Sequence, residues 1–354
     1  MQAKGKSANK IQAAINILGI ETSCDETAAA VVADGKIVKS SVVASQTKLH
    51  EKYGGVVPEI ASRAHIEKIY PVIKESLAQA EVDKNDIDAI AVANQPGLTV
   101  ALIVGVTAAK TLAITWEKPL IAINHLHAHL QSALLEQNSP ELPAVALIVS
   151  GGHTCLYDYE SPLEPKLLGS TIDDAAGEAF DKVANILKLP YPGGPAIEEA
   201  AKNGNPNAIK FPRTMLGKDS LDFSFSGIKT AVLYYCCGQD MKGQNTVDSM
   251  TSKQIADIAA SFQAAVIDVL VDKTQRAAEK IKADTVLLGG GVAANDLLRT
   301  RLQQMCDSAV PPKKLLVAPK RYCTDNAVMV ASLAYHKFNA GLFADLTLEP
   351  KASG

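Results

Sequence analysis

The chain has 354 residues, about twice the usual length of a single domain, which predicts two domains or two lobes. Hydrophobic residues make up 47% of it and charged residues 21%, so it can bury large cores, and a disordered or fibrous protein is excluded. The formal net charge is −3, and it falls to about −6 without the basic first 14 residues. This balance excludes a protein that coats nucleic acid unaided; a nucleic-acid partner would need a local basic patch or a second subunit.

Cysteine usage and hydropathy predict the compartment. The six cysteines form no C-x-x-C pair, so we expect neither a disulfide framework nor a zinc ribbon, and a reducing cytoplasm fits best. No apolar run approaches the roughly 18 residues that span a bilayer, so we expect no membrane segment. The N-terminus lacks the apolar core of a secretory signal, and we predict a disordered tail over 1–16.

From residue 17 onward, short β-branched runs alternate with segments of helical period. Asp34-Gly35 joins two of these runs and is typical of a two-residue hairpin turn. Pro58 precedes a long amphipathic segment and suits a helix start. In chain order, the first half predicts strands over 17–20, 28–33 and 36–44, a helix over 59–80, a strand over 89–93, a helix over 99–115, a strand over 120–123 and a helix containing 125–135.

A segment with two prolines, 136–143, is expected to link the two halves. The second half then predicts strands over 144–149, 154–159 and 166–171, a helix over 175–187 and, after an insertion over about 190–251, a helix over 252–282, a strand over 285–288, a helix over 293–305, a strand over 315–318 and a helix over 325–339. The same order of elements thus occurs twice, which indicates a duplicated α/β fold with a cleft between two lobes. We predict lobes over 17–138 and 139–340, with the last helix able to return to the first lobe, and a tail over 341–354.

Three of the seven histidines lie within five residues, in the tract HLHAH. On a helix, His125 and His129 share one face while His127 points away. Two imidazoles on one helical face are half of a metal site, as in the H-E-x-x-H motif of zinc proteases, but no Glu follows the first His here. A pair of partly exposed histidines near a helix start is the alternative. Asp325 could supply a third ligand, or could instead be the N-cap of the last helix.

Glycine-rich turns recur at the strand ends of the second half, in the tracts SGGHT (150–154), PGGP (192–195) and GGGVAAN (289–295). Glycine allows a ligand to approach the backbone closely, and free amides at a helix start favour phosphate. None of the tracts matches a P-loop or a full G-x-G-x-x-G, and tight turns need glycine in any case. Together the three turns favour a nucleotide site.

Acidic and hydroxyl-bearing side chains form two further candidate tracts. The turn ETSCDET (21–27) between two predicted strands resembles the phosphate-facing hairpin of the actin, sugar-kinase and chaperone ATPase superfamily; a capped, solvated turn is the alternative. Asp181 lies on a predicted helix, where a solvated charged face is the alternative. The tract DFSFSGIKT (222–230) predicts a strand followed by an N-cap.

Taken in order, nine motifs resemble those of one family: IETSCDETAAAVV, YGGVVPEIASRAH, NHLHAHL, VSGGHT, GEAFDKVA, YPGGPAIE, DFSFSGIKTAV, GGGVAAN and CTDNAVMVA. They are similar to the bacterial tRNA threonylcarbamoyladenosine transferases, formerly described as O-sialoglycoprotein endopeptidases, over about 17–340. The resemblance implies a duplicated actin-like (ASKHA, ribonuclease-H-like) α/β fold. It also implies an acyltransferase that moves the threonylcarbamoyl group of threonylcarbamoyl-AMP to the N6 amine of adenosine 37, in tRNAs that read codons beginning with adenine.

The same resemblance implies roles for individual residues. His125, His129 and Asp325 match the ligands of one divalent metal, Fe²⁺ or alternatively Zn²⁺. Asp25 and Glu26 match an acidic pair at the catalytic site. The implied substrate-binding residues are Ile148, Val149, Ser150, Gly151, Gly152, Asp181, Gly194, Glu198 and Asn295.

The chain departs from the family pattern at two positions. Gln95 stands where the family has the first glycine of G-P-G-L, so any turn that needs a positive φ there would be disturbed. His127 is an additional histidine beside the expected ligands.

The resemblance also implies partners. These are tRNA and either a paralogous TsaB-type subunit with a TsaE-type ATPase, or a second copy of the chain. Candidate tRNA contacts are Lys48, Lys52, Arg63, Arg213 and Lys229. An actin-like ATPase or kinase, which shares the fold, and a metalloprotease, which uses paired histidines, are the alternative functions.

Overall fold

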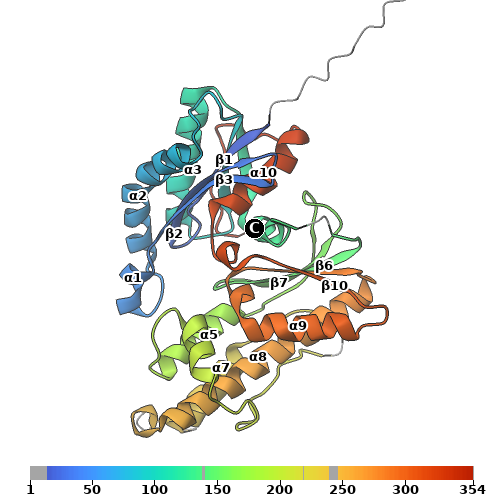
Figure 1. Cartoon of the computed structure of the whole chain (residues 1–354). Coiled ribbons are helices and arrows are strands. Elements are labelled where there is room, and N and C mark those ends of the chain that lie inside the picture. The colour runs from blue at the N-terminus through green and yellow to red at the C-terminus, as the bar shows by residue number, and fades with distance from the viewer. Residues whose placement is uncertain (1–13, 138–139, 218, 239–245, 354) are drawn as a thin grey trace, which may run out of the picture.

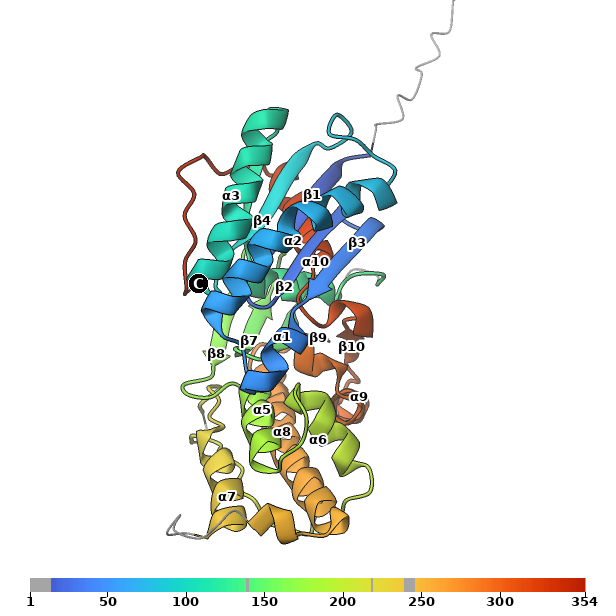
Figure 2. The same ribbon diagram turned by 90° about the vertical axis from the view of Figure 1, so that its left-hand side faces the viewer.

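The computed structural model describes residues 14–137, 140–217, 219–238 and 246–353. Over these residues the chain forms two lobes stacked end to end, each built on a five-stranded sheet (Figure 1, Figure 2). The predicted tail over 1–16 lies largely outside the described residues, and the predicted linker over 136–143 and insertion over about 190–251 fall on them only in part.

The first sheet has the strand order β3-β2-β1-β4-β5. Its strands are β1 (Asn16–Glu21), β2 (Glu26–Ala33), β3 (Ile37–Ser45), β4 (Ala89–Gln95) and β5 (Leu120–Asn124). β1 pairs antiparallel with β2 and parallel with β4. The predicted hairpin is confirmed, since Asp34 and Gly35 have φ angles of 50° and 69°, the two positive values that a type I′ turn needs.

Helices cover both faces of the first sheet. α2 (Pro58–Gln79) and α3 (Thr99–Trp116) lie side by side on one face (Figure 2), preceded by the short α1 (Thr47–His50) and the 3₁₀ turn η1 (Glu51–Tyr53). α10 (Ala327–Asn339), from the end of the chain, covers the other face. Alternation along β1 explains this sandwich, because Ile17 packs with α10 while Leu18 packs with α2.

The second sheet has the order β10-β9-β6-β7-β8. Its strands are β6 (Ala144–Val149), β7 (Thr154–Tyr159), β8 (Lys166–Ser170), β9 (Thr285–Gly289) and β10 (Lys314–Val317). In both sheets the first strand of the lobe pairs antiparallel with the second and parallel with the fourth, so the two strand orders are the same. This repetition confirms the predicted duplicated α/β fold.

The helices of the second lobe surround a large apolar core. They are α5 (Ala176–Ile186), α6 (Gly193–Ala201), α7 (Ser226–Cys237), α8 (Ser252–Lys280) and α9 (Asp296–Ser308), with 3₁₀ turns η2 (Thr246–Ser249), η3 (Gly291–Ala294) and η4 (Lys320–Tyr322). The long α8 begins at a capping box formed by Thr251 and Gln254. The remaining helix, α4 (His125–Ser132), packs against both sheets and so lies between the lobes.

The segment predicted as a tail over 341–354 folds back along the first lobe in its described part. The amide of Ala344 donates to the carbonyl of Leu120 at 2.8 Å, and that of Lys351 donates to the carbonyl of Asn94 at 2.8 Å. Backbone pairing therefore holds this segment against the ends of β4 and β5.

Several predicted elements differ from the structure, and for two helices the reason is that a different residue is the N-cap. The last helix begins at Ala327, and its N-cap is Asn326, whose side chain accepts from the Met329 amide. α9 begins at Asp296 after a 3₁₀ turn, capped by Asn295. The helix after His125 ends at Ser132, short of residue 135. In the tract 222–230 no strand forms among the described residues; Phe223 makes only an isolated bridge with Thr171.

The expectation that no apolar segment approaches 18 residues is also wrong. α3 and α8 are both long and apolar enough to cross a membrane, judged by length and composition. In α8, 67% of the apolar window is buried, as in the core helix of a soluble protein, whereas in α3 the fraction is 33%. The outer face of α3 therefore exposes apolar side chains.

Candidate metal and substrate site

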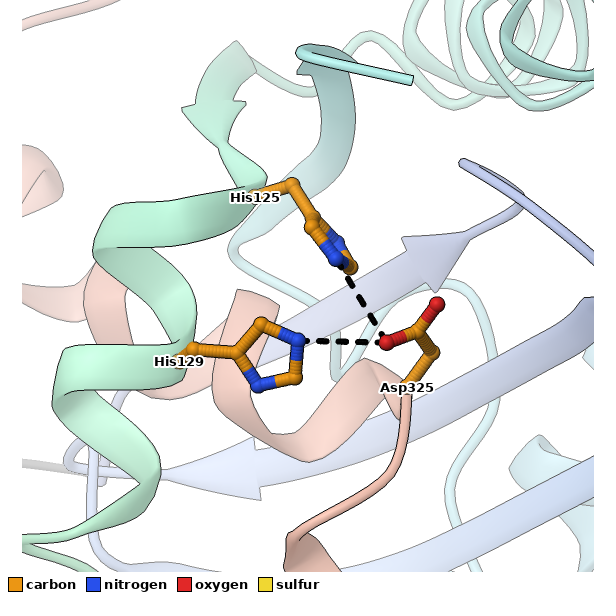
Figure 3. A group of neighbouring side chains, drawn as sticks. All are labelled: His125, His129 and Asp325. Atoms are coloured by element: carbon orange, nitrogen blue, oxygen red, sulfur yellow. Dashed lines mark hydrogen bonds and ion pairs between the residues drawn. The ribbon is translucent and has the colours of Figure 1, made fainter. Parts of the chain in front are cut away.

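Two histidines and one carboxylate meet between the lobes (Figure 3). His125 and His129 stand one turn apart on α4, which begins where Asn124 accepts from the amides of Leu126 and His127. Asp325 comes from the connection between β10 and α10, 196 residues beyond His129. The sequence spacing therefore places the imidazoles, and the packing of α10 on the first sheet brings the carboxylate to them.

The distances fit a small cation. Asp325 Oδ1 lies 3.4 Å from His125 Nε2 and 3.1 Å from His129 Nε2, and one ligand atom from each residue falls within 4.8 Å of the others. Ligands about 2.0–2.2 Å from Zn²⁺ or a similar ion are roughly 3.0–3.5 Å apart. Two imidazoles and one carboxylate are also a donor set that Fe²⁺ and Zn²⁺ accept, and three ligands leave coordination positions open. The residues present thus fit a divalent metal.

Charges around the ligands hold them in this arrangement. Burial opposes a charge on His125, but Glu21 and Asp325 outweigh it and raise the pKa of this imidazole well above its usual value. Burial also opposes the charge on Asp325, but the charges and hydrogen bonds of the two histidines outweigh this effect and lower the pKa of the carboxyl group. For His129 burial dominates and lowers the pKa, which leaves a neutral ring suited to metal binding.

Glu21 is the partner that holds His125, and the sequence did not identify it. It lies at the end of β1, fully buried, and its Oε2 is 2.9 Å from His125 Nδ1. Its Oε1 accepts from the Ser23 amide at 2.6 Å, and Ser23 Oγ lies 3.2 Å from the same Nδ1. A carboxylate on the outer nitrogen fixes the ring so that Nε2 would face a bound cation. A separation of 104 residues explains why no spacing motif shows this contact.

His125, His129 and Asp325 together are called the ligand group below, and His127 does not belong to it. Its ring packs edge-on against Tyr157, with the ring centroids 5.8 Å apart. Burial and the nearby Lys337 lower the pKa of His127 to about 4. His125 and His129, and not His127, are therefore the histidines of α4 whose ring nitrogens lie close to Asp325.

The acidic pair lies close to Asp325: Asp25 ends the turn between β1 and β2, and Glu26 is the first residue of β2. Burial, and then the charges of Asp25 and Asp325, raise the pKa of Glu26 to about 10. The Ser45 hydroxyl donates to Glu26 Oε1 at 3.1 Å. Without a metal, Glu26 therefore holds its proton at neutral pH, which makes it a poor acceptor for a second one.

The predicted substrate loop contributes two kinds of surface. Ile148 and Val149 end β6 with fully buried side chains, so only their backbone can face a ligand. Gly151 and Gly152 are exposed, and a Cβ added to either would meet no atom within 4 Å. Ser150 closes the turn, since its amide donates to the His153 carbonyl at 2.8 Å. The loop thus presents open backbone beside the ligand group.

The other predicted substrate residues tie together the elements around the site. Asp181 accepts from the Gly193 amide at 2.7 Å and so fixes the start of α6, where a Cβ added to the half-buried Gly194 would meet no atom within 4 Å. Glu198 accepts from the amide of Asp296 at 2.7 Å. Asn295 caps α9 with its oxygen and donates through Nδ2 to Gln263 Oε1 at 2.8 Å.

Two more titratable side chains lie near the group and were not singled out from the sequence. Burial, and then the charges of His125 and His129, lower the pKa of His153 to about 4. Burial raises the pKa of Tyr191, with Asp25 and Asp181 adding to the effect. Both residues lie inside motifs quoted above, VSGGHT and YPGGPAIE, and neither motif shows where these side chains point.

Gln95 causes no strain in place of the family glycine. It ends β4, pairs with Asn124 of β5 and is not among the residues with positive φ. The next glycine, Gly97, is the position that tolerates no side chain, because a Cβ there would lie 2.6 Å from the Ser23 carbonyl oxygen. The backbone at Gln95 therefore needs no positive φ, and the condition for the expected disturbance is not met.

The arrangement of the two lobes identifies the structural class of the protein. The architecture is that of the actin-like ATPase fold. HypF from T. kodakarensis superimposes with a TM-score of 0.59 at 13% identity, over 96% of this chain and 51% of that one. Component A of the (R)-2-hydroxyglutaryl-CoA dehydratase of Acidaminococcus fermentans gives 0.50 at 17% identity, over 91% of this chain and 98% of that one. At these identities the likeness concerns the fold alone.

Sequence comparison supplies the family. Residues 37–332 match the sequence model of the tRNA N6-adenosine threonylcarbamoyltransferases, TsaD. The protein of this name from Moorella thermoacetica is 51% identical over 333 residues, covering 94% of this chain and 95% of the relative. That of Thermomicrobium roseum is 49% identical, with 95% of each chain covered. The chain belongs to the tRNA N6-adenosine threonylcarbamoyltransferase family and is a transferase.

Proposed function

We propose that this protein transfers the threonylcarbamoyl group of threonylcarbamoyl-AMP to the N6 amine of adenosine 37, in tRNAs that read codons beginning with adenine. The observation that carries the proposal is that the family's two histidines and one aspartate converge on one point, with an acidic turn and an open glycine turn beside it. In the reaction the amine nitrogen bonds to the carbamoyl carbon, the bond from that carbon to the phosphate oxygen breaks, and AMP leaves.

The second lobe would hold the donor substrate. The backbone of Ile148, Val149, Ser150, Gly151 and Gly152 would face its acyl and phosphate oxygens, because backbone amides stabilise charge that develops there. Asp181, Gly194, Glu198 and Asn295 would form the adenosine side. Since both polar atoms of the Asn295 side chain already bind protein groups, its proposed role is to hold η3 and α9 in place.

The first lobe would handle the proton that the amine loses. Asp25 and Glu26 are the proposed pair, and the raised pKa of Glu26 leaves Asp25 as the acceptor. An adenine amine is a poor nucleophile, so positioning of the two substrates would supply most of the acceleration.

The metal is proposed to be Fe²⁺, with Zn²⁺ as the alternative. His125, His129 and Asp325 would hold it, and Glu21 would orient His125. When bound, it would supply Lewis-acid stabilisation to substrate oxygens in its open coordination positions.

A second subunit is proposed to complete the enzyme in the cytoplasm. The outer faces of α2 and α3 expose large apolar side chains, with exposed fractions of 63% for Ile66, 71% for Tyr70 and 47% for Ile103. We infer a paralogous TsaB-type partner on this face, acting with a TsaE-type ATPase, and a second copy of the chain as the alternative. Two of the candidate tRNA contacts are engaged internally, since Arg213 pairs with Asp268 and Lys229 with Asp174. This leaves Lys48, Lys52 and Arg63 as candidates.

The alternative functions are not favoured. A metalloprotease of the H-E-x-x-H type needs a Glu after the first histidine, and Leu126 stands there. An ATPase or kinase of this fold gives no reason for two histidines and an aspartate to converge.

A product assay tests the proposal. The protein and its proposed partners are incubated with threonylcarbamoyl-AMP and tRNA carrying adenosine 37, and the nucleosides are analysed by mass spectrometry. We expect threonylcarbamoyladenosine to form, and none with tRNA carrying guanosine at position 37. Release of phosphate from ATP by this chain alone, or cleavage of casein, without nucleoside modification would support an alternative function instead.

A further inference from the structure

A line of buried polar side chains runs behind the acidic turn, and none of the roles described above uses it. His50, His65, Gln46 and Thr27 are 0%, 0%, 2% and 0% exposed. They come from α1 (His50) and its N-cap (Gln46), from α2 (His65) and from β2 (Thr27), so three elements of the first lobe meet in this cluster. Buried polar groups are costly unless they are paired, and here the pairing is extensive.

Only one assignment of donors and acceptors satisfies the hydrogen bonds of this cluster. His65 Nε2 lies 3.0 Å from the Cys24 carbonyl oxygen, which can only accept, so Nε2 carries the proton. Burial lowers the pKa of His65, which keeps the ring neutral and leaves Nδ1 as an acceptor. Nδ1 accordingly accepts from Thr27 Oγ1 at 2.8 Å and from Gln46 Nε2 at 3.3 Å.

The line continues from Gln46 to the start of α2. Gln46 Oε1 accepts from His50 Nε2 at 3.3 Å, and His50 Nδ1 accepts from the Val57 amide at 3.3 Å. The loop between His50 and Val57 reaches the second lobe, because a Cβ on Gly54 would lie 3.2 Å from the Asn185 side chain. Figure 2 shows α1 at the level where the first lobe faces α5 and α6.

At its other end, this line of polar side chains is hydrogen-bonded to the backbone of the acidic turn. His65 holds the carbonyl of Cys24, and the amide of Gln46 donates to the carbonyl of Asp25 at 3.0 Å. Two consecutive backbone carbonyls of the turn are thus fixed from one cluster.

We propose that His65 is a positioning residue, which sets the backbone of the turn carrying Asp25 and Glu26 through its Nε2 hydrogen bond to Cys24. Gln46 and His50 connect this contact to the loop that touches the second lobe, so the turn is held in register with that lobe. The inference rests on the proposed role of the acidic pair. His65 itself touches no proposed ligand of the substrate or the metal.

Two substitutions at His65 separate the contact from simple packing. In His65→Gln the amide nitrogen can occupy the place of Nε2 and donate to Cys24, whereas in His65→Asn the amide reaches only the place of Nδ1. Ser76→Ala is the matched control, because Ser76 on the same helix makes a buried hydrogen bond to Ser40 at 2.8 Å, away from the turn. All variants are compared as the full chain with its partners, by transfer to tRNA and by melting temperature.

We expect His65→Asn to lower kcat about 10–100-fold with KM for tRNA and for threonylcarbamoyl-AMP changed less than about 2-fold, because misplacement of a reacting group acts on the chemical step. His65→Gln should recover kcat to within about 3-fold of the wild type, and Ser76→Ala should keep it despite a similar loss of melting temperature. Equal kcat losses in all three variants, or an unchanged kcat in His65→Asn, would overturn the proposal.

A double-mutant cycle separates this inference from the role of the acidic pair. If His65 acts through Asp25, the effects of His65→Asn and Asp25→Asn on kcat should be far from additive. A normal kcat in Asp25→Asn would refute the proposed acceptor while leaving the His65 contact to be judged by its own variants. Should His65→Asn fail to fold, the imidazole ¹⁵N shifts of the wild type decide: we expect the neutral Nε2–H form, and an Nδ1–H or doubly protonated ring would refute the geometry.

Discussion

The two imidazoles of the metal-ligand group are held differently, and the difference lies in single atoms. His125 Nδ1 meets Glu21 and Ser23, whereas His129 Nδ1 is buried with no hydrogen-bond partner in the described part of the chain. Away from Asp325, packing alone therefore orients the His129 ring, while a buried carboxylate holds the outer nitrogen of His125. We therefore expect metal binding by His125 to depend on Glu21, the partner of its outer nitrogen.

Glu21→Gln tests that dependence. The substitution keeps the shape but removes the negative charge beside His125 Nδ1, so metal affinity should fall about 10–100-fold. Competition with a chelator of known affinity measures the change, and Glu199→Gln, an exposed carboxylate on α6 paired with Lys202, is the control that should not alter it. Equal affinities for Glu21→Gln and the wild type would remove Glu21 from the site.

Glu26 makes a prediction about pH and stability in the metal-free protein. Its pKa is raised to about 10, against roughly 4.3 in an unfolded chain. Between these pH values the folded state binds the proton of Glu26 more tightly, so the contribution of this group to stability is fully present below about pH 4 and is lost as the pH rises towards 10. Glu26→Gln should therefore be more stable than the wild type by about 1–3 kcal/mol at pH 8, with a difference near zero at pH 4. Denaturant melts at both pH values measure this, and a pH-independent difference would contradict it.

Residue by residue, the sequence predicted what lies within one helical turn and missed what lies far apart in the chain. The spacing of His125 and His129 was enough to place them on one face. Asp325 was a candidate from its residue type, and only family resemblance chose it as a ligand over an N-cap. Glu21 went unassigned because its contact with His125 depends on how β1 and α4 pack, which no local pattern encodes.

Among the elements, β1 and α10 are packed so closely that one glycine decides their contact. A Cβ on Gly19 would lie 2.4 Å from the Ala327 carbonyl oxygen and 2.9 Å from the Ala331 amide nitrogen. Ala327 begins α10 only two residues after Asp325. The position of the Asp325 carboxylate, a proposed metal ligand, is therefore linked to the absence of a side chain on β1.

Gly19→Ala should consequently weaken both stability and metal binding. Backbone atoms cannot move aside as a flexible side chain can, so we expect a loss of about 1–3 kcal/mol in the free energy of unfolding. Metal affinity should fall with it as the start of α10 shifts. Gly227→Ala on α7 is the control, since its added Cβ meets only Thr214 Oγ1 at 3.8 Å and an alanine suits a helix. Unchanged stability in Gly19→Ala would contradict this packing.

The order of the helices and strands could be predicted from the sequence, whereas the residues at which they begin could not always be. Hairpin turns and hydrophobic periods are local, so the strands around Asp34-Gly35 were placed well. The last helix was predicted to begin at Asp325, because Asp and Asn are both good N-caps and they are adjacent here. Tertiary packing assigns the cap to Asn326 and leaves Asp325 for the ligand group.

At the scale of the whole molecule, the chain divides unevenly between the lobes. We propose the lobe boundaries 17–138 and 139–340, with α10 assigned to the first lobe because it packs on β1, β2 and β4. The connection from β10 to α10 then crosses between the lobes and carries Asp325. Relative movement of the lobes would therefore act directly on the ligand group.

The exposed apolar face of α2 and α3 makes a prediction about assembly. Ile66→Asp together with Ile103→Asp places charges on this face and should prevent the proposed TsaB-type partner from binding, without changing the melting temperature by more than a few degrees. Sedimentation of the chain alone and with the partner measures the complex. Self-association of the chain alone, abolished by the same change, would favour the homodimer, and an intact complex would place the partner elsewhere.

We propose that one cation, held by His125, His129 and Asp325, is required for transfer to tRNA. The direct measurement is a titration of the chelated protein with Fe²⁺, in parallel with Zn²⁺, while threonylcarbamoyladenosine formation is followed by mass spectrometry. We predict no product without metal, full recovery at one equivalent per chain, and no recovery in Asp325→Ala. Wild-type turnover by the metal-free protein would contradict the claim.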